Sequence, residues 1–334
     1  MKNIKASIIT PIHINNGEFY ERLDYFIRES QLYIVEPTWI QKITDKKIFD
    51  GIISSLEAGK FKNLENYKSK LDLSEIKIID SVKIKKQALE TLNNFGDKNN
   101  QGQIKKFFAD KFTNTPIIPG STLKGIFRSV FLFANADNNY KNSFSKEQVQ
   151  DLEKKANDYF KFIGFADTKI QNPNKSIQKI LGVNKKTSTG KQEGVPQVVE
   201  TVDTGDFDIN IESSNGTNID LWSDFEKTIK EYSNILITRE EQILNNIGIQ
   251  TDFIDKLYEL YDQGKYPIKI GMFKKSLSYK MFWEELLSNE VYYFDKKKQK
   301  DIMDLDMARK VGVGDKSIYL DEDQNPMGWI VLEF

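Results

Sequence analysis

The sequence contains no cysteine and a single histidine, His13. Without cysteine, the chain can form no disulfide, thiolate zinc site, cysteine-ligated iron–sulfur cluster or cysteine nucleophile. One histidine also excludes a histidine-rich metal site. These absences fit a reducing cytosol, and we expect neither a metal nor another cofactor.

Arginine is scarce as well, with five residues among the 48 basic ones. Acidic residues balance the basic residues and leave a net charge of -1. That balance argues against a protein that holds nucleic acid through its overall charge. Any RNA site must therefore be a local patch.

Long hydrophobic runs are missing too. The first six residues lack the apolar segment of a signal peptide, and no run approaches the roughly 20 residues that span a bilayer. We therefore expect a cytoplasmic protein with no membrane partner. The chain has 334 residues, 39% of them hydrophobic, which is enough for two domains or for one domain with large insertions.

The first two thirds of the chain predict strands around a helical insertion. Alternating apolar residues predict a strand over 4–14 that is broken at Pro11, and a helical pattern is expected around 22–30. A lysine-rich, mainly helical insertion is expected over about 41–111. The polar stretch 171–196 predicts a long loop, and 197–211 predicts a hairpin that turns at Asp203–Asp206.

A linker-like run near residue 213 separates an expected N-terminal domain, 1–212, from a C-terminal α+β domain, 213–334. Helix-start signals in the second domain predict two helices after Ser223 and a third near 252–261. Strands are expected at 267–270 and at the chain end, and a further helix at 281–287. The order of elements predicts an α+β protein with antiparallel sheets, and a ferredoxin-like βαββαβ core is the best specific guess.

The most informative segment is the turn and helix start from Pro119 to Arg128. On a helix, Leu123, Ile126 and Phe127 share an apolar arc, beside a polar arc that carries Lys124 and Arg128. Two like charges four residues apart repel each other, and both stand near the positive end of the helix dipole. A phosphate partner explains this placement. The alternative is a core helix whose Lys and Arg are simply solvated.

Three segments together resemble the RAMP superfamily of CRISPR-associated proteins: Thr10–Glu18, Ile118–Arg128 and the strand Phe207–Ile211. The resemblance implies a ferredoxin-like, RRM-type fold that holds CRISPR RNA. Length, the lysine-rich insertion and the closing Pro326–Trp329 look most like the subunit that caps the 3′ end of the CRISPR RNA in the type III-A (Csm) effector. Implied partners are this RNA, a backbone RAMP subunit and the other subunits of the complex, with host trimming nucleases as a further candidate.

One segment departs from the superfamily pattern. Many RAMP proteins carry a glycine-rich loop near the C-terminus, whereas Ile270–Ser276 has the single glycine Gly271. Lys274 and Lys275 could replace the backbone contacts by charge. A second candidate for the loop is the pair Gly312 and Gly314.

The expected RNA contacts combine the helix start, the polar loop, the two lysines after Gly271 and the one histidine. The residues are Ser121, Thr122, Lys124, Arg128, Lys185, Lys186, Lys191, Lys274, Lys275 and His13. For the loop lysines, a solvated loop is the alternative. His13 is interpreted as structural or as touching RNA without chemistry.

No catalytic or metal-binding residue is expected. Asp301, Asp304 and Asp306 scatter around a helix or turn, and an EF-hand reading at 321–332 fails because Pro326 replaces the required glycine. Phosphate-binding glycine motifs and the G-x-S-x-G motif are missing.

The sequence therefore favours a non-catalytic RNA-binding subunit. Three alternatives stay open. One is a metal-independent endoribonuclease that processes CRISPR RNA with His13 as general base. Another is a different RAMP subunit, either the backbone or the holder of the 5′ tag. The third is a scaffold protein unrelated to RNA.

Overall fold

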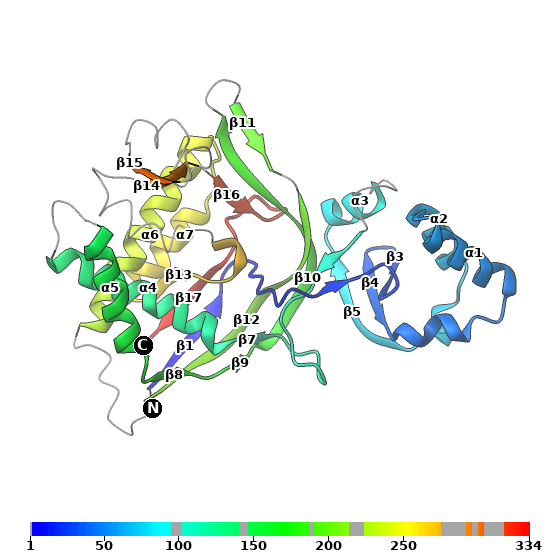
Figure 1. The fold of residues 1–334 in the computed structure, drawn as a ribbon, viewed down its shortest axis with the longest axis horizontal. Coiled ribbons are helices and arrows are strands. Elements are labelled where there is room, and N and C mark those ends of the chain that lie inside the picture. Colours follow the sequence, from blue (N-terminus) through cyan, green and yellow to red (C-terminus); the bar gives the residue numbers. More distant parts are fainter. Residues whose placement is uncertain are drawn as a thin grey trace.

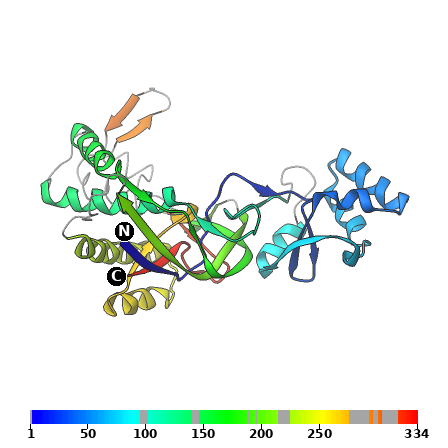
Figure 2. The same ribbon diagram turned by 90° about the horizontal axis from the view of Figure 1, so that it is seen from below.

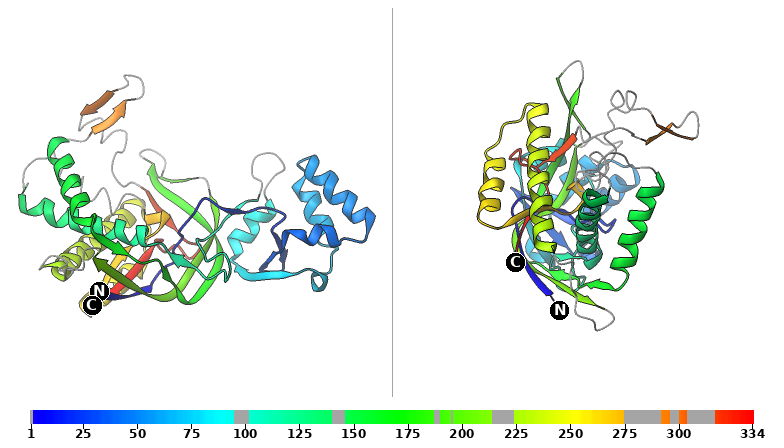
Figure 3. Two further views of the ribbon diagram at one scale, coloured as in Figure 1. Left: turned by 60° about the horizontal axis from the view of Figure 1, so that its bottom comes forward. Right: turned by 90° about the vertical axis from the view of Figure 1, so that its left-hand side faces the viewer.

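The computed structural model describes residues 2–94, 102–139, 146–186, 190–194, 196–213, 224–274, 292–295, 300–303 and 317–334. It shows a mixed α+β fold with a body, from which a smaller lobe, formed by residues 21–94 and 102–103, projects (Figures 1 and 2). The two chain ends lie side by side at the end of the body away from the lobe (Figure 3).

One large sheet runs through both parts, in the order β13-β17-β1-β12-β10-β5-β4-β3. In the body, β1 pairs antiparallel with β12 on one side and with β17 on the other, so that residues near both ends of the chain become neighbours. The strands of this path are β13 (Tyr266–Lys269), β17 (Trp329–Glu333), β1 (Lys2–Ile8), β12 (Gln197–Ser213), β10 (Gln171–Lys186), β5 (Ile78–Ile84), β4 (Gln31–Val35) and β3 (Tyr25–Arg28).

Shorter strands attach to this path or pair separately. They are β2 (Phe19–Tyr20), β6 (Ile104–Lys105), β8 (Ile163–Phe165), β11 (Gly190–Glu193) and β16 (Ser317–Leu320) on the large sheet, and β7 (Ile117–Ile118) with β9 (Thr168–Lys169) and β14 (Tyr292–Asp295) with β15 (Lys300–Met303) as pairs.

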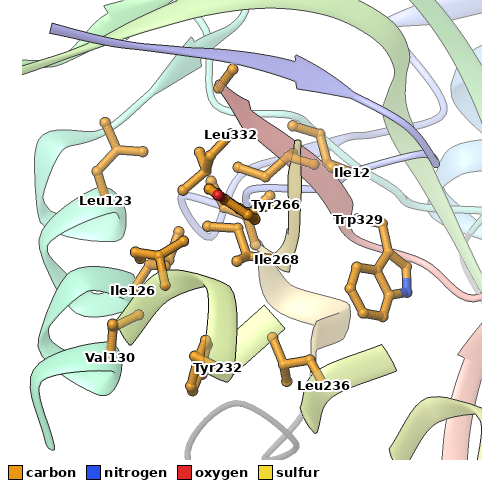
Figure 4. Close-up of a cluster of buried hydrophobic side chains, with 14 of the residues drawn as sticks. Ile12, Leu123, Ile126, Val130, Tyr232, Leu236, Tyr266, Ile268, Trp329 and Leu332 are labelled. Atoms are coloured by element: carbon orange, nitrogen blue, oxygen red, sulfur yellow. The ribbon is translucent and has the colours of Figure 1, made fainter. Parts of the chain in front are cut away.

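Four helices pack against the body sheet: α4 (Gly120–Asn139), α5 (Lys146–Phe160), α6 (Phe225–Ile247) and α7 (Phe253–Asp262). The apolar arc expected on α4 is buried, with Leu123 and Phe127 at 0% exposure. It meets α6, β13 and β17 in the main core, to which Ile126, Tyr232 and Leu332 all belong (Figure 4). The apolar period of the α4 sequence thus places its opposite, polar face outward.

The lobe has helices on both faces of its strands. Helix α3 (Lys86–Asn94) covers one face, and α1 (Lys46–Glu57) with α2 (Phe61–Lys68) covers the other, where Phe26 and Trp39 are buried. Short 3₁₀ turns complete the chain at η1 (Pro37–Lys42), η2 (Leu73–Glu75) and η3 (Met272–Lys274).

Polar contacts join the lobe to the body. The Glu322 carboxylate accepts hydrogen bonds from the backbone N–H groups of Gln87 at 2.7 Å and Ala88 at 2.8 Å, at the start of α3. Lys175 of β10 forms an ion pair with Asp80 of β5. A carboxylate at a helix N-terminus satisfies amides that have no partner within the helix, so these contacts stabilise the junction.

Two predictions about the long strands are wrong. The expected loop 171–196 is strand β10 followed by β11, and the expected hairpin 197–211 is the single strand β12. Instead of turning the chain, Gly205 has a φ of +151° and sits where the register between β10 and β12 shifts. Gly205 therefore accommodates the irregular hydrogen-bond pairing between β10 and β12 at this point.

Two helix predictions also need correction. A single helix, α6, replaces the two expected after Ser223, and the expected helix near 22–30 is strand β3. The expected helix at 281–287 lies outside the described residues. The ferredoxin-like core and the domain boundary at 212/213 stay predictions, although strands from both sides of that boundary pair in one sheet.

Candidate nucleic-acid interface

The start of α4 is held close to the connection between β8 and β9. The Gly120 N–H donates to Asp167 Oδ1 at 2.7 Å, and a Cβ atom at Gly120 would lie 1.9 Å from the Phe165 carbonyl oxygen. Only glycine fits so close an approach of two backbones. The motif glycine therefore fixes where the polar face of α4 begins.

That polar face carries the four predicted residues of the helix start. Ser121 is exposed, whereas Thr122, Lys124 and Arg128 are half-buried. Lys124 Nζ donates to the Ile163 carbonyl oxygen at 3.1 Å. Both cations therefore remain at the surface, but neither side chain is fully extended into solvent.

Arg128 has partners on α5. Its Nη2 donates to Glu153 Oε2 at 2.5 Å and to Asn157 Oδ1 at 3.1 Å. The Glu153 carboxylate offsets the repulsion between Lys124 and Arg128. A second helix thus orients the guanidinium, a constraint that the sequence did not indicate.

We expect Arg128→Glu to lower the free energy of unfolding by about 1 kcal/mol, because it sets two carboxylates against each other at a partly buried position. Exchanging the pair, Arg128→Glu with Glu153→Arg, should restore most of this loss. Chemical denaturation of the single and double variants measures the coupling. A double variant as unstable as Arg128→Glu would contradict the ion pair.

His13 lies in the core, with 1% of its surface exposed. Its Nδ1 is 2.7 Å from the Glu200 carbonyl oxygen, and its ring lies between Phe107 and Phe273. Burial lowers the pKa of His13 to about 4, so the imidazole is neutral at neutral pH. This burial contradicts the prediction that the His13 side chain contacts RNA, because RNA cannot reach the ring without a rearrangement of the protein.

His13 should make stability fall in acid. Its folded-state pKa of about 4 lies below the ordinary histidine pKa of 6.5, so the unfolded chain binds the proton more readily. Between about pH 7 and about pH 5 this linkage should cost about 2 kcal/mol of stability. The raised pKa of Asp321, about 6 through burial, acts in the opposite direction. Chemical denaturation of wild type and of His13→Gln at both pH values therefore measures how much of the pH dependence of the free energy of unfolding comes from His13. An equal pH dependence in the two proteins would contradict the prediction.

The Gly271 turn lies directly against the His13 backbone. The Met272 N–H donates to the His13 carbonyl oxygen at 2.8 Å, and Gly271 has a φ of +87°. A Cβ at Gly271 would lie 2.6 Å from the same oxygen. Lys274 follows in η3, of which the backbone is described, and Lys275 lies outside the described residues, as do Gly312 and Gly314.

Lys105 is a residue of this region that the sequence interpretation missed. Its Nζ donates to Gln197 Oε1 at 2.6 Å and lies 4.0 Å from Met272 Sδ, beside the Gly271 turn. Lys106 Nζ lies 4.7 Å from the centre of the Tyr20 ring. The adjoining cations and aromatic residues at 105–108 were the available signal, but they stood within a stretch that is lysine-rich throughout.

Backbone hydrogen bonds connect the α4 start to the Gly271 turn. Phe108 N–H donates to the Ile14 carbonyl oxygen at 2.7 Å, and Ile117 N–H donates to that of Phe108 at 2.9 Å. The chain then enters α4 three residues after Ile117. The α4 start, the segment 105–108 and the Gly271 turn are therefore linked through backbone hydrogen bonds that include those of His13 and Ile14, and we call these three segments together the His13 strip.

The remaining predicted lysines lie elsewhere. Lys185 of β10 stands opposite Lys191 of β11, and Lys186 stands opposite Gly190. This hairpin is at the other end of β10 from the α4 start (Figure 1). The structure thus brings these three lysines together with one another, but not with the helix start.

Among the described residues, no group of three or more His, Cys, Asp or Glu side chains is arranged to hold a metal ion. Asp321 instead accepts backbone N–H groups from Asp323 at 2.9 Å and Asn325 at 2.8 Å within its own turn. In the part of the chain that is described, no helix is long and apolar enough to cross a membrane.

Comparisons with known proteins agree on one family. The model of the RAMP superfamily matches residues 5–276. A curated protein of Methanocaldococcus jannaschii, named CRISPR system Cms protein Csm5, is 27% identical over an alignment of 226 residues that covers 62% of this chain and 51% of that protein. A protein of the same name from Streptococcus thermophilus is 27% identical over 138 residues, covering 39% of this chain and 38% of that one. The match thus spans about half or less of these relatives.

Two solved structures share the fold over almost the whole chain. One is the cryo-EM structure of a Csm–crRNA–target RNA ternary complex of a type III-A CRISPR-Cas system, in which one chain gives a TM-score of 0.65 at 17% identity and full coverage of both chains. The other is the crystal structure of T. onnurineus Csm5, with a TM-score of 0.64 at 16% identity and coverage of 98% and 99%. At such identities, the likeness concerns the fold.

Proposed function

The chain belongs to the RAMP superfamily, and we propose that it is the subunit of a type III-A CRISPR effector complex that holds the 3′ end of the CRISPR RNA. In this role it binds RNA without cleaving it and ends the row of backbone RAMP subunits. It also sets where RNA trimming stops, and host trimming nucleases are candidate partners at that step.

The observation that carries the proposal is the His13 strip. It links the start of α4, with its cationic face, to the segment of Lys105 through backbone hydrogen bonds, and the exposed Met272 lies beside Lys105. Cations that track a phosphate backbone next to exposed apolar side chains suit single-stranded RNA. The family membership and the curated relatives named Csm5 support the same role.

The burial of His13 favours binding over cleavage. A general base must come within hydrogen-bond distance of the 2′-hydroxyl that it deprotonates. The His13 ring is enclosed by Phe107 and Phe273 and has 1% exposure. Incubation of repeat RNA with the purified protein in EDTA tests this point: intact RNA is expected, and specific cuts that His13→Ala abolishes would establish the endoribonuclease instead.

The RNA contact itself is tested with Lys105→Glu/Lys106→Glu in the assembled complex. We expect this variant to assemble but to retain less CRISPR RNA, because two cations of the His13 strip become repulsive to phosphate. Lys46→Glu/Lys47→Glu, which reverses two exposed lysines at the start of α1, is the matched control. Equal RNA occupancy in both variants would contradict the assignment.

The number of copies of this chain in each complex separates two roles. One copy per complex is expected for the subunit that caps the 3′ end, whereas several copies would indicate a backbone subunit.

A further inference from the structure

The lobe contains a cleft of about 280 Å³ that lies outside the His13 strip. It is formed between the end of β3, helix α2 and the end of α3. Two of the five arginines of the whole sequence line it. Its lining residues are Arg22, Ile27, Arg28, Phe61, Lys62, Glu65, Asn66, Ser69, Leu92 and Asn93.

Both guanidinium groups are held in place by the protein. Arg22 is 6% exposed, and its Nη2 donates to the Leu92 carbonyl oxygen at 3.2 Å. Arg28 Nη2 donates to the carbonyl oxygens of Lys68 at 2.9 Å and Leu71 at 3.3 Å. These hydrogen bonds orient the two guanidinium groups before any ligand binds, which reduces the conformational entropy lost on binding.

Positive charge exceeds negative charge at this cleft. Among its lining residues, all of which are described, Glu65 is the one carboxylate. Its Oε1 already forms ion pairs with Arg22 Nη1 at 3.4 Å and with the buried Lys68 Nζ at 3.0 Å. Arg28 and Lys62 add two further cations. Gathering cations around a single carboxylate is unfavourable, and an anionic ligand would relieve it.

The remaining walls suit a nucleotide. Ile27, Phe61 and Leu92 supply apolar surface, and Asn66, Ser69 and Asn93 supply exposed hydrogen-bonding groups. A volume of about 280 Å³ is near the lower end for small-molecule sites, so it accommodates about one nucleotide. Lys62 lines the cleft and is exposed, so an incoming phosphate can reach it.

We propose that this cleft binds one phosphate-bearing nucleotide of a single-stranded RNA, with Arg28 and Lys62 on the phosphate and the apolar wall beneath the base or sugar. The proposal rests on the RNA-binding function above and adds a second contact, in the lobe. A bound strand would thus touch both parts of the molecule.

The experiment uses the purified full chain and a short 4-thiouridine-substituted oligouridylate. We expect photo-crosslinks to the peptide that carries residues 61–69, in addition to those at the His13 strip. Lys62→Glu should weaken binding several-fold and reduce the magnitude of the log–log salt slope by about 0.7, the value for one phosphate on a single strand. Lys46→Glu is the control, because it reverses an exposed lysine of the same lobe that does not line the cleft.

The outcomes are distinguishable. If the chain binds the oligouridylate but gives no crosslink in the lobe, and Lys62→Glu behaves like Lys46→Glu, the cleft assignment is wrong while the proposed function stands. If the wild-type chain binds no RNA, both fail. If uridine monophosphate binds as tightly as the oligouridylate and with the same dependence on Lys62, the site takes free nucleotides, and the RNA assignment is overturned.

Discussion

Replacing Glu240 with alanine is expected to lower the free energy of unfolding by about 3 to 5 kcal/mol, the range for breaking one side of a buried ion pair. Glu240 of α6 is fully buried, and its partner Lys269 of β13 has 2% exposure. The alanine variant would leave the ammonium group without its counter-ion in the core.

The pair is also part of a larger contact. Trp329 Nε1 donates to Glu240 Oε1 at 3.1 Å, and Lys269 Nζ lies 5.2 Å from the centre of the Trp329 ring. One carboxylate therefore joins α6 to β13 and β17. Losing it removes a hydrogen bond from the indole as well as the charge partner.

Denaturant titration of Glu240→Ala measures this loss. The matched variant is Glu240→Met/Lys269→Met, which removes both charges and keeps apolar volume, and it should recover a large part of the stability. If Glu240→Ala were within about 1 kcal/mol of wild type, a range typical of exposed pairs, the buried network would be contradicted.

The second large effect is expected at Gly120. Gly120→Ala should cost about 3 kcal/mol, because the new Cβ would lie 1.9 Å from the Phe165 carbonyl oxygen and α4 would have to move. The shift would also weaken the hydrogen bond from the Gly120 N–H to Asp167. RNA retention should fall together with stability, because the cationic face of α4 moves with the helix.

Gly125 of the same motif is the matched control. Apart from its chain neighbours and the backbone of α4 itself, no atom lies within 4 Å of a Cβ built at Gly125, and alanine in a helix interior is favoured over glycine by about 1 kcal/mol. Gly125→Ala should therefore stabilise the isolated chain. Thermal denaturation of both variants checks the pair, and equal stability of the two would contradict the contrast between the two glycines.

Local sequence patterns predicted those helices and strands whose buried residues lie close together in the sequence. The apolar arc of α4 followed from spacing alone, since Leu123, Ile126 and Phe127 are neighbours on any helix of that sequence. The final strand and β13 followed in the same way. The position of the polar face of α4 was therefore available before the structure.

Pairings between distant segments were not available. Polar residues made 171–196 look like a loop, but β10 is stabilised by its pairing with β12, and Ser176, Gln178 and Thr201 form hydrogen bonds with one another and with Asp203. A buried polar cluster of this kind has no apolar alternation to reveal it.

The same distinction between local and distant residues applies to the candidate site. The helix start was found because its residues are consecutive, whereas Lys105 and the Gly271 turn meet only in the folded chain, where Lys105 Nζ lies 4.0 Å from Met272 Sδ and the Met272 N–H donates to the His13 carbonyl oxygen. Arg22 and Arg28 converge with Lys62 only after β3 and α2 pack together in the lobe. The burial of His13 also depends on Phe107 and Phe273, which come from distant parts of the chain.

The most direct test of the proposed function is to map the 3′ ends of the CRISPR RNA in effector complexes assembled with and without this chain. Complexes that contain it are expected to carry RNA with a narrow set of 3′ ends, crosslinked to the His13 strip. Complexes that lack it should carry RNA of altered length or lose it. An unchanged distribution of 3′ ends, with no crosslink to this chain, would contradict the proposed function.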